Sequence, residues 1–300
     1  MGGIAFVFSG QGDQYPGMGM ELCSDHKSAA KVFAMCDAIR PGTANQCFYG
    51  SDKELSKTVN TQPCLYAMEL AAAAVLMDKG IRPGAVAGFS MGELTAAAIA
   101  GVFDWETGFR LICRRGALMH GEAVKHNTAM AAIVRLTPEK VTELCKKHDR
   151  LYPVNFNCPG QITVSGMLTE FPAFFEEVRE AGGRGILLKV RGAFHSPFME
   201  PAATAFAKEL EKAKLREPKL PIYSNVTAEP YGDAMELLPK QIKSPVLWEK
   251  TVRNMIASGI DTFIEVGPGR TLTNMIRKTD PQVKTYSVSE LDSLFSEVLA

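Results

Sequence analysis

The sequence has no surplus of charge of either sign, no long hydrophobic run and no paired cysteine motif. Lys plus Arg and Asp plus Glu both number 33 in the 300 residues. This balance argues against nucleic-acid binding as the main task, because neutralising phosphates requires a basic surplus. No apolar run approaches the length of a membrane span, and the first residues lack the basic lead of a signal peptide. The seven cysteines are scattered without a Cys-x-x-Cys pair, so we expect reduced thiols in a cytoplasmic protein.

There is enough apolar sequence for a large core. Hydrophobic residues make up 46% of the chain, and this length suits one large domain or one domain with an insert. The first third alternates predicted strands with predicted helices, a pattern typical of a mostly parallel sheet covered by helices. The strands are predicted at 4–8 and 85–87 and the helices at 19–39, 61–79 and 105–120.

The middle segment, 128–190, has a different order of elements. Its pattern predicts a strand, a helix, two strands joined by a hairpin, a helix and a strand. This is the βαββαβ unit of a ferredoxin-like α+β subdomain. Thr137 is expected to cap the first of these helices, with Pro138 in the first turn.

After this segment the α/β rhythm returns. Helices are predicted at 201–215 and 248–258, and strands at 221–226 and 262–266. We therefore expect residues 1–127 and 191–300 to form one large α/β domain, with 128–190 as an inserted subdomain.

The most informative local pattern is Gly-Phe-Ser-Met-Gly at 88–92, between a predicted strand end and a predicted helix. A sharp strand-to-helix turn would lift the Ser90 hydroxyl clear of the sheet, and glycines are needed beside it because side chains there would collide with neighbouring backbone. The helix start supplies free N–H groups and a positive dipole end beside a developing oxyanion. The pattern predicts a nucleophilic serine; the alternative is a glycine-rich turn with an incidental serine.

Ser90 needs a base, since a serine hydroxyl is a weak nucleophile until its proton is removed. His195 is the best candidate among the five histidines, because it follows a predicted strand in a loop, where α/β folds place catalytic groups. The alternative for His195 is a loop histidine that caps a helix. The other histidines lie on or beside predicted helices in polar surroundings and are expected at the surface: His26, His120, His126 and His148.

No Asp or Glu between Ser90 and His195 stands out as the acid that orients the imidazole in a serine hydrolase. Asp104 and Glu106 begin a predicted helix and are expected to cap it. This leaves open a serine–histidine dyad whose imidazole is oriented by a backbone carbonyl.

Two further residues stand in unusual places. Arg115 lies in a helix that is otherwise apolar on one face, so it needs a partner if it is buried. It is either half of an ion pair with a nearby carboxylate or a fixed guanidinium that binds a carboxylate of the substrate. Gln11 lies in the glycine-rich turn after the first strand. It either donates its backbone N–H to an oxyanion or belongs to an ordinary tight turn, and the glycine spacing there does not match a dinucleotide fingerprint.

Several motifs occur together in an order that resembles one family, the malonyl-CoA:acyl carrier protein transacylases, with the acyltransferase domains of polyketide synthases as relatives. They extend over nearly the whole chain, at 6–12, 88–93, 115–119, 153–161, 193–196 and 265–269. The resemblance implies a hydrolase-like, mostly parallel α/β core with an inserted ferredoxin-like subdomain, in agreement with the order of elements above.

The resemblance also implies roles for the matching residues. Ser90 would be the acylated nucleophile, and His195 its base and later its acid. Arg115 would pair with the free carboxylate of the malonyl group. The backbone N–H groups of Gln11 and Met91 would form the oxyanion hole.

The implied reaction is a ping-pong transfer of a malonyl group from malonyl-CoA to the phosphopantetheine thiol of acyl carrier protein, without a metal or bound cofactor. Phe194 would crowd the α-carbon of the acyl group and disfavour methylmalonyl, at about 1–3 kcal/mol for one methyl group. The alternatives are a serine esterase or thioesterase, and a non-catalytic module that binds carrier protein. Since carrier proteins are usually acidic, a basic patch is expected, with Lys189, Arg191, Arg277 and Lys278 as candidates.

Two positions depart from the family's pattern. Phe89 stands where the family often has His before the nucleophile, which removes a polar neighbour of the site. Leu247 stands where the family often has Gln in a Pro-Val-x-Trp motif. If this position orients His195 through its backbone carbonyl, Leu is tolerated. If its side-chain polarity matters, catalytic efficiency or substrate choice changes.

Overall fold

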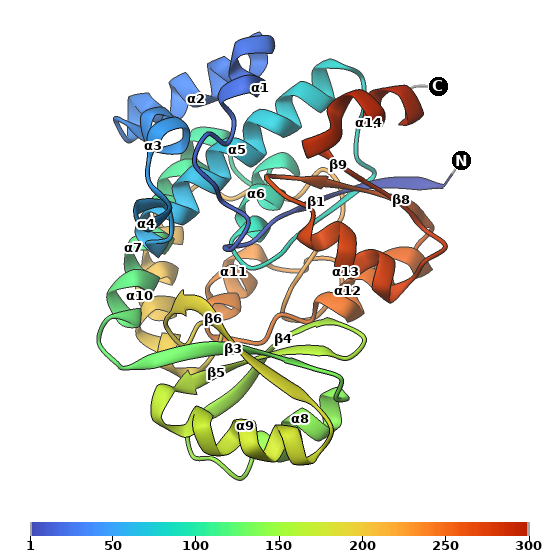
Figure 1. Cartoon of the computed structure of the whole chain (residues 1–300). Helices are drawn as coiled ribbons and strands as arrows, with labels where there is room; N and C mark the ends of the chain where they lie inside the picture. Colours follow the sequence, from blue (N-terminus) through green and yellow to red (C-terminus); the bar gives the residue numbers. More distant parts are fainter. Residues whose placement is uncertain (1, 299–300) are drawn as a thin grey trace.

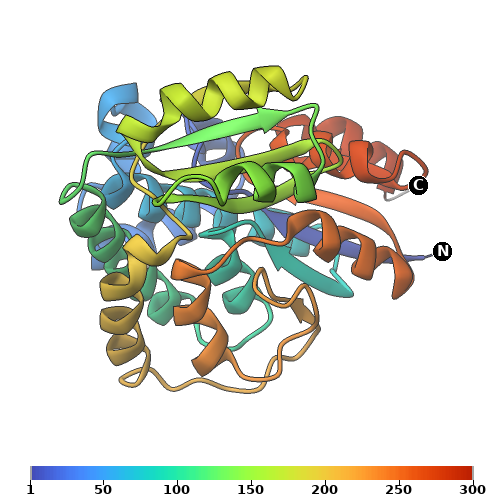
Figure 2. The ribbon, with the colours of Figure 1, turned by 90° about the horizontal axis from the view of Figure 1, so that it is seen from below.

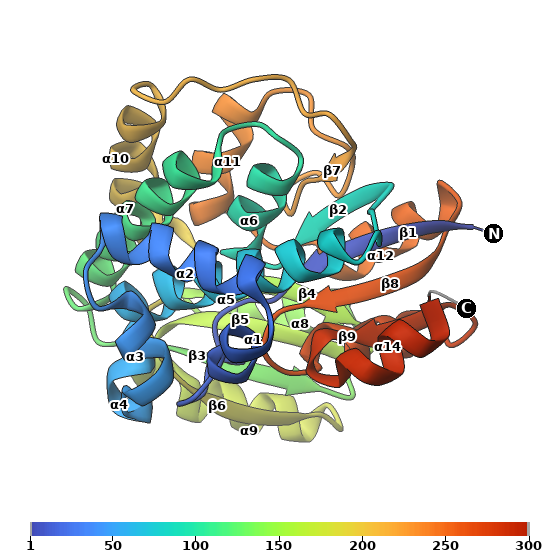
Figure 3. The same ribbon diagram turned by 90° about the horizontal axis from the view of Figure 1, so that it is seen from above.

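The strands of the large domain form one parallel sheet. The structure, a computed structural model, describes residues 2–298, and the sheet order is β7-β2-β1-β8-β9 with every neighbouring pair parallel (Figures 1 and 3). The strands are β1 (Gly3–Phe8), β2 (Ala85–Gly88), β7 (Ile222–Tyr223), β8 (Ile260–Val266) and β9 (Lys284–Ser287). The mostly parallel α/β core predicted from the sequence is confirmed.

Helices cover both faces of this sheet because its central strands are apolar on both sides. Phe6 and Phe8 pack into the larger core, whereas the alternate residues Ala5 and Val7 pack into the smaller one, which contains Trp248. The larger core includes residues of α2 (Lys27–Ile39), α5 (Thr58–Asp78), α6 (Gly92–Ile99) and α7 (Trp105–Ala123), and the smaller core includes residues of α12 (Trp248–Ala257) and α13 (Thr271–Thr279).

Helix α5 runs through the middle of the larger core. All of residues 61–76 are buried, and a helix that is enclosed on every side is fixed by its neighbours rather than by one apolar stripe. The alanine run 71–74 within it lets adjacent helices approach closely. Polar side chains on α5, such as Gln62 and Glu69, are therefore held in defined positions inside the protein.

The second sheet is antiparallel and belongs to the inserted segment. Its order is β4-β5-β3-β6, and the chain runs β-α-β-β-α-β, the ferredoxin-like arrangement expected from the sequence. The elements are β3 (Thr128–Val134), α8 (Pro138–Cys145), β4 (Leu151–Cys158), β5 (Gln161–Met167), α9 (Phe171–Glu180) and β6 (Arg184–Arg191). Figures 1 and 2 show the two helices on the outside, with the sheet between them and the large domain. Thr137 caps α8 by accepting a hydrogen bond from Lys140, as predicted.

We propose 128–190 as the limits of the insert: β3 begins at Thr128, and β6 ends at Arg191, one residue beyond the second limit. The rest of the chain, 1–127 and 191–300, then forms the large domain, of which residues 1, 299 and 300 lie outside the described part. Hydrogen bonds join the units: the Val246 N–H donates to the Val154 carbonyl over 2.8 Å, the Phe156 N–H donates to the Val246 carbonyl over 2.9 Å, and the Ser165 hydroxyl donates to the Phe194 carbonyl over 3.2 Å.

Several predicted boundaries were wrong. The predicted helix 19–39 is two helices, α1 (Met20–Asp25) and α2, because His26 adopts an extended conformation. The predicted helix 201–215 ends at Leu210, and the predicted strand 221–226 contains only β7.

The remaining elements are α3 (Thr43–Tyr49), α4 (Asp52–Leu55), α10 (Glu200–Leu210), α11 (Ala234–Lys243), α14 (Leu291–Val298) and the short 3-10 helices η1 (Leu168–Glu170), η2 (Pro197–Met199) and η3 (Val288–Glu290).

Within residues 2–298, no helix combines the length and the apolar character that crossing a bilayer requires.

Candidate active site

Ser90 lies on a tight turn between β2 and α6. Its φ is +54°, a left-handed conformation that is uncommon and strained for a residue other than glycine. Glycine is required on both sides: a Cβ on Gly88 would lie 1.9 Å from the Gly92 carbonyl carbon, and a Cβ on Gly92 would lie 2.4 Å from the Phe8 carbonyl oxygen. The turn has the form of a nucleophile elbow, which exposes a serine hydroxyl above the sheet.

Asn225 holds this strained turn from the loop after β7. Its side-chain Oδ1 accepts a hydrogen bond from the Ser90 N–H over 2.8 Å, and its Nδ2 donates to the Gly88 carbonyl over 2.6 Å. Both partners are backbone groups of the turn, so Asn225 satisfies polar groups that the bend leaves without secondary-structure partners.

His195 contacts Ser90 directly. The Ser90 Oγ and His195 Nε2 are 2.7 Å apart, and the opposite ring nitrogen, Nδ1, lies 2.9 Å from the Gln241 carbonyl oxygen. Because a carbonyl can only accept, Nδ1 carries the proton and Nε2 is left to accept one from Ser90. Burial, with a further contribution from the Arg115 charge, lowers the pKa of His195 to about 4, so the imidazole is neutral near pH 7.

The site is therefore a dyad in which a carbonyl orients the imidazole. The hypothesis that Leu247 supplies this carbonyl is wrong, because the carbonyl belongs to Gln241. Asp104 caps α7 by accepting from the Thr107 N–H over 2.7 Å, and Glu106 lies in the first turn, as predicted. Among the other histidines, His148 differs from the expectation: its side chain is only 10% exposed and lies 3.3 Å from a Glu177 carboxylate oxygen.

Arg115 is fully buried in α7, close to the dyad. Its Nη1 donates to Gln62 Oε1 over 2.9 Å and its Nη2 to Gln241 Oε1 over 2.7 Å, while its buried Nε has no hydrogen-bond partner among residues 2–298. In the described part of the chain no carboxylate oxygen lies within 4.0 Å of the guanidinium, so the ion-pair interpretation is not supported. Burial lowers the pKa of Arg115 to about 10, which still leaves it charged at neutral pH.

Gln241, near the end of α11, connects these residues. Its side-chain Nε2 donates to the Ser90 carbonyl, its Oε1 accepts from Arg115, and its backbone carbonyl accepts from His195. The sequence does not mark Gln241 as a site residue, because an amide neither titrates nor acts as a nucleophile. No helix or strand was predicted for the segment that contains it, 234–243, which forms α11.

The first loop of the chain, after β1, lies against the elbow. The Phe89 N–H donates to the Phe8 carbonyl over 2.9 Å, and a Cβ on Gly10 would lie 2.7 Å from the Phe89 ring. This brings the loop that contains Gln11 beside the turn that contains Met91. Within residues 2–298, neither the Gln11 N–H nor the Met91 N–H donates to an internal acceptor, as an oxyanion hole requires.

Phe194 and Phe89 are packed rather than free. Phe194 precedes His195, is 6% exposed, and its carbonyl accepts from Ser165. Phe89 makes an edge contact with Trp248, with ring centroids 5.7 Å apart. The residue that replaces the family's histidine therefore fills space between the elbow and α12, and it leaves the contact between Ser90 and His195 intact.

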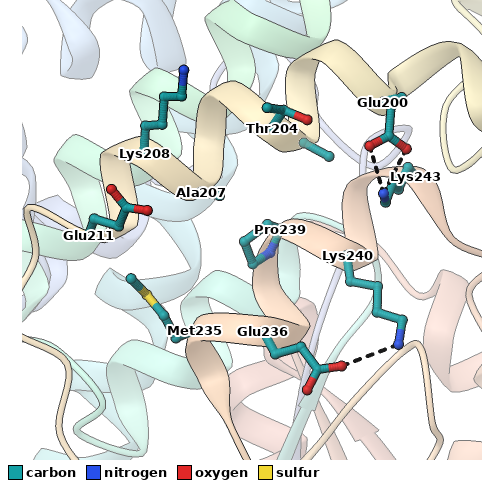
Figure 4. A pocket seen from close by; sticks show the side chains of 11 residues that line it. Glu200, Thr204, Ala207, Lys208, Glu211, Met235, Glu236, Pro239, Lys240 and Lys243 are labelled. Carbon is teal, nitrogen blue, oxygen red and sulfur yellow. Dashed lines mark hydrogen bonds and ion pairs between the residues drawn. The ribbon is translucent and has the colours of Figure 1, made fainter.

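A groove of about 480 Å³ lies elsewhere, between α10 and α11. Ala207, Met235 and Pro239 line it, and Lys243 pairs with Glu200 along its edge (Figure 4). Neither Ser90 nor His195 lines this groove, so we do not assign acyl chemistry to it.

A parallel α/β fold with a serine on a strand-to-helix elbow and a histidine in contact with it is the arrangement of a serine-dependent acyl-transfer enzyme. Comparison with known proteins agrees. The family model described as "Acyl transferase domain" matches residues 5–293. The chain therefore belongs to this acyltransferase family, in the group that contains the malonyl CoA-acyl carrier protein transacylases.

Individual relatives match over nearly their whole length. The malonyl CoA-acyl carrier protein transacylase of Bacillus subtilis (strain 168) is 34% identical, with 98% of this chain and 96% of the relative covered. That of Synechocystis is 35% identical, with 97% and 99% covered. The crystal structure of the transacylase from Clostridium perfringens superimposes with a TM-score of 0.95 at 34% identity, covering 99% of this chain and 97% of that one. The structure of a malonyl-transacylase in complex with a type II polyketide acyl-carrier protein superimposes with a TM-score of 0.93 at 32% identity, covering 98% of this chain and 98% of that one.

Proposed function

We propose that this protein transfers a malonyl group from malonyl-CoA to the phosphopantetheine thiol of acyl carrier protein through a malonyl-Ser90 ester. The observation that supports this most strongly is the common contact through Gln241: one residue touches Ser90, His195 and Arg115. A nucleophile, its base and a receptor for a carboxylate therefore belong to one site.

In the first half-reaction the Ser90 Oγ attacks the thioester carbonyl carbon while His195 Nε2 takes the hydroxyl proton. The carbonyl oxygen becomes an oxyanion, which the N–H groups of Gln11 and Met91 stabilise. The carbon–sulfur bond then breaks, and the proton passes from His195 to the departing CoA sulfur. Malonyl-Ser90 and CoA thiol remain.

In the second half-reaction the carrier's phosphopantetheine thiol is the nucleophile. It gives its proton to His195 as its sulfur attacks the ester carbon, and the same two N–H groups stabilise the oxyanion. The carbon–oxygen bond to Ser90 breaks, and His195 returns the proton to the Ser90 oxygen. No proton is gained or lost over the two steps, as a ping-pong cycle requires.

Arg115 gives the site its preference for an acid. Within residues 2–298 the charged guanidinium is held by two neutral amide oxygens and contacts no carboxylate, and a malonyl carboxylate can pair with it directly. A simple thioesterase has no need of such a group, which argues against that alternative. The Ser90–His195 distance of 2.7 Å argues against a non-catalytic carrier-binding module. Phe194, packed beside His195, is proposed to disfavour a methyl branch at the acyl α-carbon.

For the carrier partner we propose the exposed basic residues of β6. Lys189 and Arg191 are exposed on this edge strand, which leads directly into the loop of His195. Arg277 is a weaker candidate, because its guanidinium donates to Thr285; Lys278 is exposed on α13.

We also propose that the protein works in the cytoplasm, in keeping with its seven free thiols.

The test is intact-protein mass spectrometry after incubation with malonyl-CoA, followed by peptide mapping. We expect the mass of one malonyl group on Ser90 and its loss when carrier protein with a free phosphopantetheine thiol is added. Ser90→Ala is the control. Malonylation of that variant, or release of free malonate without transfer to the carrier, would contradict the proposal.

A further inference from the structure

Glu93 is a buried carboxylate three residues after the nucleophile, and the mechanism above does not use it. It lies in the first turn of α6 and is fully buried. Its Oε1 accepts from the Tyr231 hydroxyl, and its Oε2 accepts from the Gln241 Nε2 over 2.9 Å and from the Asn225 N–H over 3.3 Å. Because three groups donate hydrogen bonds to this buried carboxylate, its position in the site is fixed.

The position of Glu93 bears on the orientation of the Gln241 amide. The two ends of that amide have opposite hydrogen-bonding character, so a half-turn of the group exchanges a donor for an acceptor. With Nε2 towards Glu93, the Oε1 faces Arg115, and the contact is favourable. With the amide reversed, an NH₂ group would face the guanidinium, donor against donor, and an oxygen would face the carboxylate.

The other acceptors around Nε2 are weaker than Glu93. They are the Ser90 carbonyl and the Asn225 Oδ1, which is 3.2 Å away and already accepts from the Ser90 N–H. Both are neutral, and hydrogen bonds to an ionised acceptor are the stronger ones. An NH₂ group has two protons for three acceptors, so the carboxylate is the dominant anchor.

We infer that Glu93 is a positioning residue for malonyl recognition: it fixes the Gln241 amide so that Gln241 Oε1, together with Gln62, holds the Arg115 guanidinium towards the acyl group. This inference rests on the proposed function. Glu93 acts through Gln241 and touches no substrate atom. Tyr231 donates to the other carboxylate oxygen, Oε1, which Gln241 does not contact.

The first experiment measures acylation of Ser90 by malonyl-CoA and by acetyl-CoA, which lacks the second carboxylate. At about pH 8 Glu93 is ionised, because burial raises its pKa only to about 7. For Glu93→Gln we expect the ratio of malonyl to acetyl kcat/KM to fall roughly ten-fold. An equal loss for both substrates would overturn the inference, since it would indicate a purely structural role. A rise in the ratio would also overturn it, since it would mean that removing the negative charge beside Arg115 outweighs the loss of orientation.

Glu69→Gln is the matched control. Glu69 is an equally buried carboxylate on α5 that accepts from the Ser9 hydroxyl and touches neither Gln241 nor Arg115. Whatever its effect on stability, it should change both acyl transfers by the same factor. Tyr231→Phe removes only the donor to Glu93 Oε1, and it should keep the ratio of malonyl to acetyl kcat/KM within about two-fold of the parent value.

Two further measurements separate this inference from the proposed function. If Glu93 acts through Gln241, the Glu93→Gln change should leave the ratio unchanged in a Gln241→Ala background; a full ten-fold loss there would contradict the route. Independently of any activity, the side-chain NH₂ signal of Gln241 in ¹⁵N-labelled protein should shift and lose exchange protection in Glu93→Gln. Failure of the parent to become malonylated would refute the function, whereas an unchanged Gln241 signal would refute the inference.

Discussion

The two ends of the site differ in how complete they are. At the reacting end, Ser90 and His195 already contact each other, and the imidazole has its orienting carbonyl. At the other end, which we propose selects the acyl group, the Arg115 guanidinium has two neutral acceptors and a buried Nε that has no partner within the described residues. The dyad is thus complete without substrate, whereas within residues 2–298 the guanidinium is held only by amide oxygens.

This difference separates the residues that set the rate of acyl transfer from those that set the preference for one acyl group. In the proposed mechanism Ser90 and His195 act on the thioester carbonyl, which acetyl-CoA and malonyl-CoA share, so the reacting end does not distinguish an acid from a neutral acyl group. Arg115 lies on the buried face of α7, and we propose that its guanidinium binds the carboxylate of the acyl group. Changes at the first end should therefore lower every acyl transfer, and changes at the second should lower malonyl transfer selectively.

The largest effect is expected at the reacting end. Ser90→Ala removes the atom that carries the acyl group, so acylation by malonyl-CoA and by acetyl-CoA should both fall at least about a thousand-fold. Rapid-quench measurement of acyl-enzyme gives the two rates. Residual malonylation at a neighbouring serine, such as Ser9, would show that the elbow had been assigned wrongly.

Arg115→Ala should divide the two substrates. Loss of a charge-assisted pair in a dry site costs about 2–5 kcal/mol, so malonyl kcat/KM should fall by a factor of roughly thirty to several thousand, whereas acetyl transfer should change little. Arg114→Ala is the matched control. Arg114 precedes it on α7, has a half-exposed side chain and pairs with Glu209 at the surface. Similar losses for malonyl and acetyl transfer in Arg115→Ala would erase the distinction between the two ends.

The pH dependence tests the reacting end alone when acetyl-CoA is the substrate, because Arg115 then has no acyl carboxylate to bind, and its orientation by Gln241 and Glu93 does not affect the reaction. The active histidine is neutral, and burial lowers the pKa of His195 to about 4. Acylation should therefore stay level as the pH falls from about 8 to about 5 and decline only as it passes about 4. A half-loss near pH 6.5, the ordinary value for histidine, would mean that the imidazole is hydrated. Circular dichroism at each pH confirms that the protein is still folded.

The sequence predicted the parts of the site that local chemistry marks. The glycines on each side of Ser90 and the strand-to-helix transition lie within a few residues of one another, so a short stretch of sequence is enough to predict the turn. His195 was identified because it is a titratable group at a strand end. The βαββαβ order of the insert was readable because each helix and strand has its own period and breakers.

The supporting residues were not predictable in this way. Gln241 and Asn225 are 151 and 135 residues from Ser90 in sequence, and neither amide carries a charge or a motif that marks it. The part of the chain around them, after β7, contains short elements and an internal Pro239 in α11, which weakens any periodic signal. Only the folded arrangement shows that this segment orients the nucleophile, the base and the arginine together.

The smallest effect is expected outside both ends, on β6. Ile186, Leu187 and Leu188 are exposed there between basic residues, and the strand is the edge of its sheet. Lys189→Glu should raise the KM for an acidic carrier about three- to ten-fold at low salt, and the effect should shrink as salt screens the charges. Acylation by malonyl-CoA, which precedes carrier binding, should be unchanged. Lys212→Glu, a change at another well-exposed lysine, should leave the carrier KM unaffected. If Lys189→Glu alters acylation but not the carrier KM, β6 acts on the His195 loop that it leads into, and the carrier docks elsewhere.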